Sequence, residues 1–167
     1  RPGQRVQVIL LDLRWNRSPL NSVSKHEYQQ AKVPNKQGPY EPVKQPEATF
    51  LGEQQWQWLE QQLQQPADLR LIGSSLQLLS EFTGWESWAN FPRERQRLFD
   101  LINRHQVNGV FIVSGDTHWA EFSRVDDAVG ALGAARLLGR SRQGVRHLLQ
   151  ELRRVFCPSF RLRGRRT

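Results

Sequence analysis

Residues 107–118 read VNGVFIVSGDTH, and this stretch decides the fold. A short run of apolar and β-branched residues between turn residues is typical of a buried strand, which we predict over 107–114. Gly115 then opens a turn that carries Asp116 and His118. Two ionisable side chains at the carboxyl end of a buried strand indicate either a turn cap or a functional site.

Similar patterns lie upstream. Strands are predicted over 5–12 and 68–75, where apolar runs end on polar residues. A helix is predicted over 52–64, because its apolar residues recur at spacings of three and four, and a second helix begins near Pro92. The order strand, helix, strand, helix, strand predicts an α/β fold with a mixed or parallel sheet flanked by helices.

Two irregular stretches interrupt these elements. The segment between the first strand and the first helix is rich in Pro, Gln, Lys and Asn and has no period, so we expect a long loop with a solvated His26. The aromatic residues of GWESWANFP (84–92) predict a packed corner, with a pocket wall as the alternative. His105 lies on the apolar face of the second predicted helix and is interpreted as a core histidine with a satisfied ring.

Polar residues cluster where the predicted strands end. Ligands of open α/β sheets gather at the carboxyl ends of the strands, which favours a site over simple caps. The strand-end residues are Asp12 with Arg14, then Ser74, Ser75 and Gln77, then Asp116 and His118.

Each strand-end group has a functional and a structural interpretation. The carboxylate of Asp116 and the imidazole of His118 suit Zn, Fe, Mn or Co, although two ligands do not complete a catalytic metal site. The alternative is that Asp116 caps a turn and His118 bonds to a carbonyl. The guanidinium of Arg14 can hold an anionic oxygen such as a phosphate, but spacing alone favours an ion pair with Asp12.

The charge is unevenly distributed. Of the 167 residues, those from 124 onward hold eleven arginines, no lysine and three acids, whereas 1–123 hold 13 bases and 13 acids. The net charge of +8 therefore says nothing about the chemistry of the neutral body. The single cysteine, Cys157, excludes an internal disulfide, and no apolar run is long enough to span a bilayer.

Several motifs occur together in an order typical of one family. These are ILLDLRWNR, FLGEQQWQWLEQQL, LRLIGSSLQ, GWESWANFPRERQRL and GVFIVSGDTHWAE. Over residues 5–123 the chain resembles the alkaline phosphatase D-like (PhoD-like) metallophosphoesterases. The resemblance implies that 1–127 are the carboxyl-terminal portion of the catalytic domain, a four-layer α/β sandwich incomplete at its amino terminus.

The resemblance also implies a function. The family's enzymes are metal-dependent phosphoric ester hydrolases, phosphatases or phosphodiesterases, with two divalent or trivalent ions (Ca, Fe, Zn, Mn or Co) that activate a water. Asp116 and His118 become the expected catalytic and metal-binding residues, and Arg14 and Gln77 the expected substrate-binding residues. Because the family's other ligand motifs would precede Arg1, we expect this fragment alone to be inactive. An extracytoplasmic location, periplasmic or secreted, is implied by resemblance only.

Residues 128–167 do not share the resemblance. Their Arg-, Gly- and Ala-rich composition favours an out-of-frame or chimeric tail, disordered or partly helical, as a hypothesis. The alternative function for the chain is a basic module that uses this tail to bind nucleic acid or an acidic surface. The leading interpretation is instead an enzyme acting on a phosphate ester, with no specific nucleic acid partner.

Overall fold

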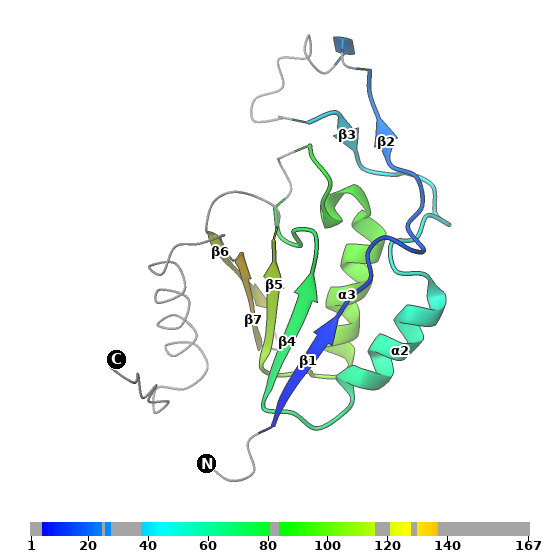
Figure 1. Cartoon of the computed structure of the whole chain (residues 1–167). Coiled ribbons are helices and arrows are strands. Elements are labelled where there is room, and N and C mark those ends of the chain that lie inside the picture. The colour runs from blue at the N-terminus through cyan, green and yellow to red at the C-terminus, as the bar shows by residue number, and fades with distance from the viewer. Residues whose placement is uncertain are drawn as a thin grey trace, which may run out of the picture.

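The protein is described by a computed structural model that covers residues 5–24, 26–27, 38–80, 84–115, 121–127 and 130–136 (Figure 1). Its elements, in chain order, are β1 (Val6–Leu10), β2 (Asn21–Ser22), β3 (Tyr40–Glu41), α2 (Glu53–Leu63), β4 (Leu69–Ser74), the 3-10 helix η1 (Trp88–Asn90), α3 (Pro92–Arg104), β5 (Val110–Ser114), β6 (Glu121–Asp127) and β7 (Gly130–Arg136).

The main sheet has five strands in the order β1-β4-β5-β7-β6. The pairs β1–β4, β4–β5 and β5–β7 are parallel, and β6 runs antiparallel to β7. Helices α2 and α3 lie against one face of this sheet (Figure 1). The predicted α/β class, with a mixed sheet and flanking helices, is therefore confirmed.

The three predicted strands and two predicted helices are all present, with small shifts at their ends. The last of these strands begins at Val110 rather than at residue 107, because Gly109 makes a tight turn with φ +67°. A Cβ at Gly109 would lie 2.3 Å from the carbonyl oxygen of Asp68, so no larger residue fits that backbone approach.

Two features of the fold have no sequence signal. β2 and β3 pair antiparallel through only two residues each, Asn21↔Glu41 and Ser22↔Tyr40, and strands this short show no period. β7 comes from the segment that the sequence set apart as a tail, and its residues GALGAAR lack the β-branched residues typical of strands. β7 is nevertheless a strand of the main sheet, because it pairs in parallel with β5 from Phe111↔Gly133 to Ser114↔Arg136.

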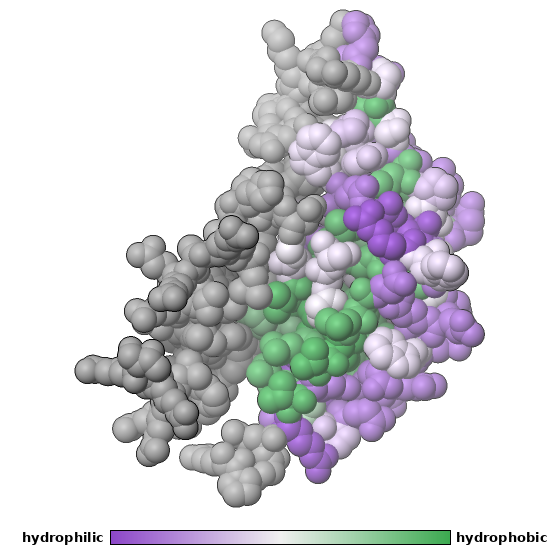
Figure 2. Space-filling model, in the orientation of Figure 1, coloured by the Kyte–Doolittle hydropathy of each residue, from purple (hydrophilic) through white to green (hydrophobic). Residues whose placement is uncertain are grey.

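One face of the main sheet is covered by helices. The other face is open at the edge strand β1, but Phe111 of β5 on that face is only 5% exposed. Along β1, Val6, Val8 and Leu10 are 60, 64 and 75% exposed, whereas Ile9 between them is 2% exposed. Ile9 belongs to the core beneath α2 and α3, together with Ile72 of β4 and Ile112 of β5. On the opposite face, hydrophobic residues gather over the strands (Figure 2).

A buried carboxylate joins the two helices. Glu94 in the first turn of α3 is 7% exposed, and its Oε2 accepts hydrogen bonds from the backbone N–H of Phe50 at 2.6 Å and of Leu51 at 3.2 Å. Thr49 Oγ1 donates to the same oxygen at 3.0 Å, and Trp56 Nε1 of α2 donates to both carboxylate oxygens at 3.0 and 2.9 Å. Glu94 therefore satisfies the donors of the chain that leads into α2.

A second, exposed contact lies beside this carboxylate. Arg97 of α3 forms a bidentate pair with Glu53 of α2, at 2.8 and 3.0 Å. Its guanidinium also lies 4.7 Å from the ring centroid of Trp56, a cation–π arrangement. The hydrogen bond from Arg97 is the main cause that lowers the pKa of Glu53 below its ordinary value.

Among the described residues no helix is long and apolar enough to cross a membrane.

The two faces of β1 give a first test. Ile9→Ala should lower the free energy of unfolding by about 2–4 kcal/mol, since it leaves a cavity in the core. Val8→Thr, one residue away on the open face, should change it by about 0.5 kcal/mol or less. Urea unfolding of the two variants measures both values. Equal losses would contradict the assignment of the two faces.

The Glu94 cluster gives a second test. Glu94→Gln keeps the shape but removes the charge that four donors share, so we expect a loss of about 1.5–3 kcal/mol. The matched control is Glu53→Gln, which breaks an exposed pair and should cost about 1 kcal/mol or less. Chemical denaturation followed by tryptophan fluorescence compares the two. A control loss as large as that of Glu94→Gln would show that Glu94 holds no special position.

Candidate functional site

The carboxyl ends of the parallel strands meet at one edge of the sheet. Leu10 of β1 lies opposite Gly73 of β4, and Ser74 lies opposite Ser114 of β5. The chain leaves these strands toward the β2–β3 ribbon (Figure 1). The carboxyl ends of β1, β4 and β5 are therefore neighbours, and this is the edge where the sequence predicts a site.

The first strand end is a turn built on Asp12. Its Oδ1 accepts hydrogen bonds from the backbone N–H groups of Arg14 at 2.8 Å and Trp15 at 3.1 Å. These two bonds, that from Arg14 first, lower the pKa of Asp12 below its ordinary 3.8. The predicted ion pair between the side chains of Asp12 and Arg14 is thus wrong. The carboxylate is engaged by backbone donors of the turn, and the Arg14 side chain is free to pair elsewhere.

Arg14 pairs with Glu86 instead. Its Nη1 lies 3.2 Å from Oε2 of Glu86, and Nη1 of Arg17 lies 2.7 Å from the same oxygen. The side chains of Arg14, Arg17 and Glu86 are 62, 17 and 26% exposed. These three side chains carry a summed charge of +1, and the Asp12 carboxylate lies in the neighbouring turn. Arg14 is the accessible cation of the cluster. Sequence reasoning missed this cluster, because Glu86 lies about 70 positions along the chain from Arg14 and Arg17.

The second strand end lies mostly inside the protein. Ser74 is buried, its hydroxyl donates to the carbonyl oxygen of Leu76, and Trp88 Nε1 donates to the hydroxyl at 3.0 Å. Gln77 is 8% exposed, and its backbone carbonyl oxygen accepts a hydrogen bond from the backbone N–H of Trp88 at 2.9 Å. The structure therefore places Gln77 beneath the edge, whereas Arg14 lies on it.

The aromatic corner predicted for GWESWANFP is present. Trp88 and Phe91 are buried against Phe50, with ring centroids 4.8 Å apart in an edge-to-face pair and 4.6 Å apart in a stacked pair. Trp85 is half exposed. The packed-corner interpretation holds for Trp88 and Phe91.

The third strand end is described only as far as Gly115. Asp116 and His118, together with the arginine-rich segment from 137 onward, lie outside the described residues. Within the described part of the chain, no three His, Cys, Asp or Glu side chains lie close enough together to hold a metal ion. His26 is exposed, as predicted. His105 is partly exposed rather than part of the core, and its Nε2 lies 2.6 Å from Oε1 of Glu60.

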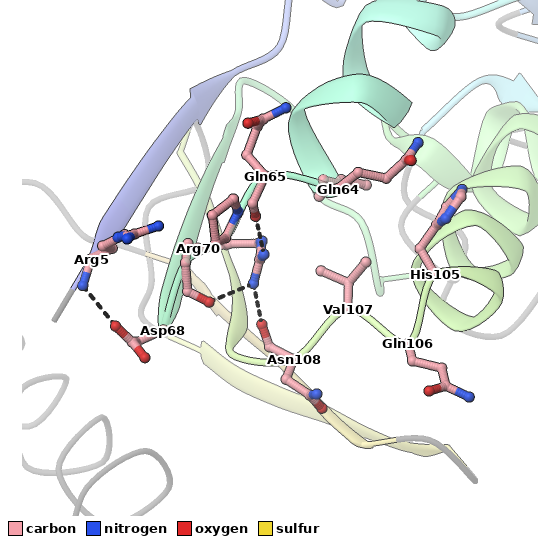
Figure 3. A pocket seen from close by; sticks show the side chains of 12 residues that line it. Arg5, Gln64, Gln65, Asp68, Arg70, His105, Gln106, Val107 and Asn108 are labelled. Carbon is pink, nitrogen blue, oxygen red and sulfur yellow. Dashed lines mark hydrogen bonds between the residues drawn. The ribbon is translucent and has the colours of Figure 1, made fainter. Parts of the chain in front are cut away.

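A pocket of about 660 Å³ lies at the opposite, amino-terminal edge of the sheet (Figure 3). Its central group is the buried guanidinium of Arg70, which donates to the carbonyl oxygens of Gln65 at 2.6 Å, Ala67 at 3.0 Å and Asn108 at 2.8 Å. Burial is the main influence on its pKa and lowers it below its ordinary value. Arg70 thus joins the chain before β4 to the chain before β5.

The end of α3 forms one wall of this pocket. The N–H of Val107 bonds to the carbonyl oxygen of Ile102 at 2.9 Å, and the residue between helix and strand, Gln106, has φ +49°. This is the left-handed turn that commonly ends helices and favours glycine.

One family model matches most of the chain. The PhoD-like phosphatase family model matches residues 1–137. The chain belongs to the PhoD-like phosphatase family. The match extends past residue 123, where the motifs of the sequence end, and includes β6 and β7.

Two relatives show how much of the family's proteins this chain represents. The alkaline phosphatase D of Bacillus subtilis (strain 168) is 26% identical over 124 residues, which cover 66% of this chain and 21% of that protein. A solved structure described as "Structure of PhoD" has a TM-score of 0.56 and 21% identity, and the likeness covers 83% of this chain and 27% of that one. The latter similarity shows the fold. The chain spans about a fifth of the curated PhoD-like relative and about a quarter of the solved chain.

The turn at Gln106 gives a third test. Gln106→Gly should raise the free energy of unfolding by about 0.5–1 kcal/mol, because it relieves the left-handed backbone of an L-residue with a side chain. The matched control is Gln64→Gly at the C-cap of α2, where φ is −80° and glycine should destabilise. Thermal unfolding of both variants measures the difference in sign. Destabilisation by both would contradict the argument.

Proposed function

We propose that this chain forms part of a metal-dependent phosphoric ester hydrolase. The observation that carries the proposal is an exposed guanidinium, that of Arg14, at the strand edge where ligands of α/β folds bind, in a chain of the PhoD-like phosphatase family. Arginine's planar fork matches two phosphate oxygens at once. The substrate in this proposal is a phosphate ester, a monoester or a diester.

The residues would divide the work by position. Arg14 would bind the anionic oxygens of the substrate and hold its phosphorus over the strand ends. Gln77 is a predicted substrate-binding residue that is buried below this edge, and its backbone carbonyl oxygen accepts a hydrogen bond from the backbone N–H of Trp88. Asp116 and His118 follow β5, which lies beside β4 in the sheet, so they would enter the same edge from the next strand.

Asp116 and His118 supply the donor types that such a site needs. A carboxylate oxygen and an imidazole nitrogen suit the Ca, Fe, Zn, Mn and Co ions that the family resemblance implies. Two bound ions would supply a water acidic enough to attack phosphorus near neutral pH. Because two protein ligands do not complete a catalytic site, we expect this chain to bind a metal weakly and not to turn over substrate alone.

The alternative function, binding of nucleic acid or an acidic surface by the arginine-rich segment, rests on residues outside the described part of the chain. No observation favours it over the hydrolase. The extracytoplasmic location belongs to the same proposal as the hydrolase and is supported by the family resemblance.

Metal binding tests the proposed function directly. Titration of the purified chain with Mn²⁺ or Zn²⁺ in a calorimeter should show a weak site, and His118→Ala should weaken it by roughly tenfold or more. The matched control is His26→Ala, which removes an exposed histidine and should leave the affinity unchanged. Equal affinity in the wild type and His118→Ala would refute the role of this histidine.

Hydrolysis assays complete the test. p-Nitrophenyl phosphate and bis(p-nitrophenyl) phosphate report monoester and diester cleavage by the metal-loaded chain. We expect no turnover, because Asp116 and His118 alone do not complete a catalytic metal site. If the chain does hydrolyse either substrate and His118→Ala abolishes the activity, the expectation of inactivity is wrong. The same result would support the proposed hydrolase function.

A further inference from the structure

We propose that Glu86 is a positioning residue that holds Arg14 in place to bind an anionic oxygen of the substrate. This inference rests on the proposed function, because it assumes that an anion binds at the carboxyl edge of the sheet. It assigns to Glu86 a role that runs against its charge: a carboxylate that aids the binding of an anion.

The first argument is the fixed position of Glu86. The neighbouring Ser87 N–H bonds to Asn90 Oδ1 at 2.7 Å, and Trp88 is fully buried. On the other side, the N–H of Tyr40 bonds to the carbonyl oxygen of Gly84 at 2.9 Å. The segment packs so closely there that a Cβ at Gly38 would lie 2.2 Å from that oxygen. Glu86 therefore projects from a backbone held on both sides.

The second argument is the difference between the two arginines. Arg17 is largely buried and makes the shorter contact, 2.7 Å, so it fixes the Glu86 carboxylate. The neighbouring Ser18 ties this part of the chain to Thr49 through two hydrogen bonds, of 2.9 and 3.0 Å. Arg14 makes the longer contact, 3.2 Å, and remains 62% exposed. One arginine anchors the carboxylate and the other is presented to solvent.

Arg14 is held at its backbone and at one end of its side chain, and the rest of its guanidinium faces solvent. The Asp12 carboxylate fixes its backbone. Within the described residues, its side chain forms an ion pair through Nη1 alone. The remaining N–H groups of the guanidinium can therefore receive an anionic oxygen. Holding a long, flexible side chain in its binding position in advance lowers the entropy that is lost when the ligand binds.

Charge and positioning make opposite predictions for one substitution. Glu86→Gln raises the local charge by one unit, so electrostatic attraction alone would strengthen the binding of an anion. If Glu86 positions Arg14, the same substitution should weaken it, because the neutral amide holds the guanidinium less firmly. A purely structural salt bridge would not give this sign.

The experiment measures the affinity of the full chain for inorganic phosphate at neutral pH and low salt, by titration calorimetry. We expect Glu86→Gln to weaken binding roughly three- to tenfold, and Glu86→Asp, which keeps the carboxylate, to restore part of the affinity. In an Arg14→Ala background, Glu86→Gln should have little further effect, because Glu86 acts through Arg14. Asp100→Asn, the same charge change at an exposed position of α3, should leave phosphate affinity unchanged.

Three results would overturn the inference. Phosphate affinity that is equal or higher in Glu86→Gln, with thermal unfolding near that of the wild type, would show that Glu86 only opposes the anion. An undiminished effect of Glu86→Gln in the Arg14→Ala background would show that it acts elsewhere. Absence of phosphate binding in the wild type would remove the anion site itself. The His118-dependent metal titration decides the proposed function separately in each case.

Discussion

The carboxylate of Glu94 is the interaction on which the arrangement of the two helices depends. It accepts hydrogen bonds from the chain that enters α2 and from Trp56 within α2, while it belongs to α3. A buried charge is costly unless hydrogen bonds satisfy it, and the same bonds would be left without an acceptor if it were lost. Glu94 therefore fixes α2 against α3, and the two helices together cover one face of the sheet.

Helix α2 is also hydrogen-bonded to the turn that follows β1. Gln55 of α2 exchanges two hydrogen bonds with the backbone of Asp12, from its Nε2 to the carbonyl oxygen at 2.8 Å and from the Asp12 N–H to its Oε1 at 2.9 Å. The Asp12 turn in turn fixes the backbone of Arg14. A chain of polar contacts thus runs from the core carboxylate to the exposed guanidinium. Functional groups held this way lose little entropy on binding.

Helices cover one face of the sheet, and the other face is exposed along its edge strand β1. Helices bury Ile9, Ile72 and Ile112, whereas Val6, Val8 and Leu10 face outward at the edge strand β1. Apolar strand residues on both faces are typical of parallel sheets that are covered on both sides. This agrees with a chain that spans about a fifth of its curated relative, in a family whose resemblance implies a sandwich of several layers.

Local patterns in the sequence determined the elements and their class. Apolar runs and helical spacing placed β1, β4, β5, α2 and α3, and the ordered motifs identified the family, because burial leaves a periodic trace within each segment. The tertiary structure alone decided which distant groups meet: Glu86 with Arg14, Glu94 with Trp56, and Arg70 with the carbonyl oxygen of Asn108. Those contacts join segments that are far apart along the chain, and a polar residue carries no mark of its partner until packing brings the two together.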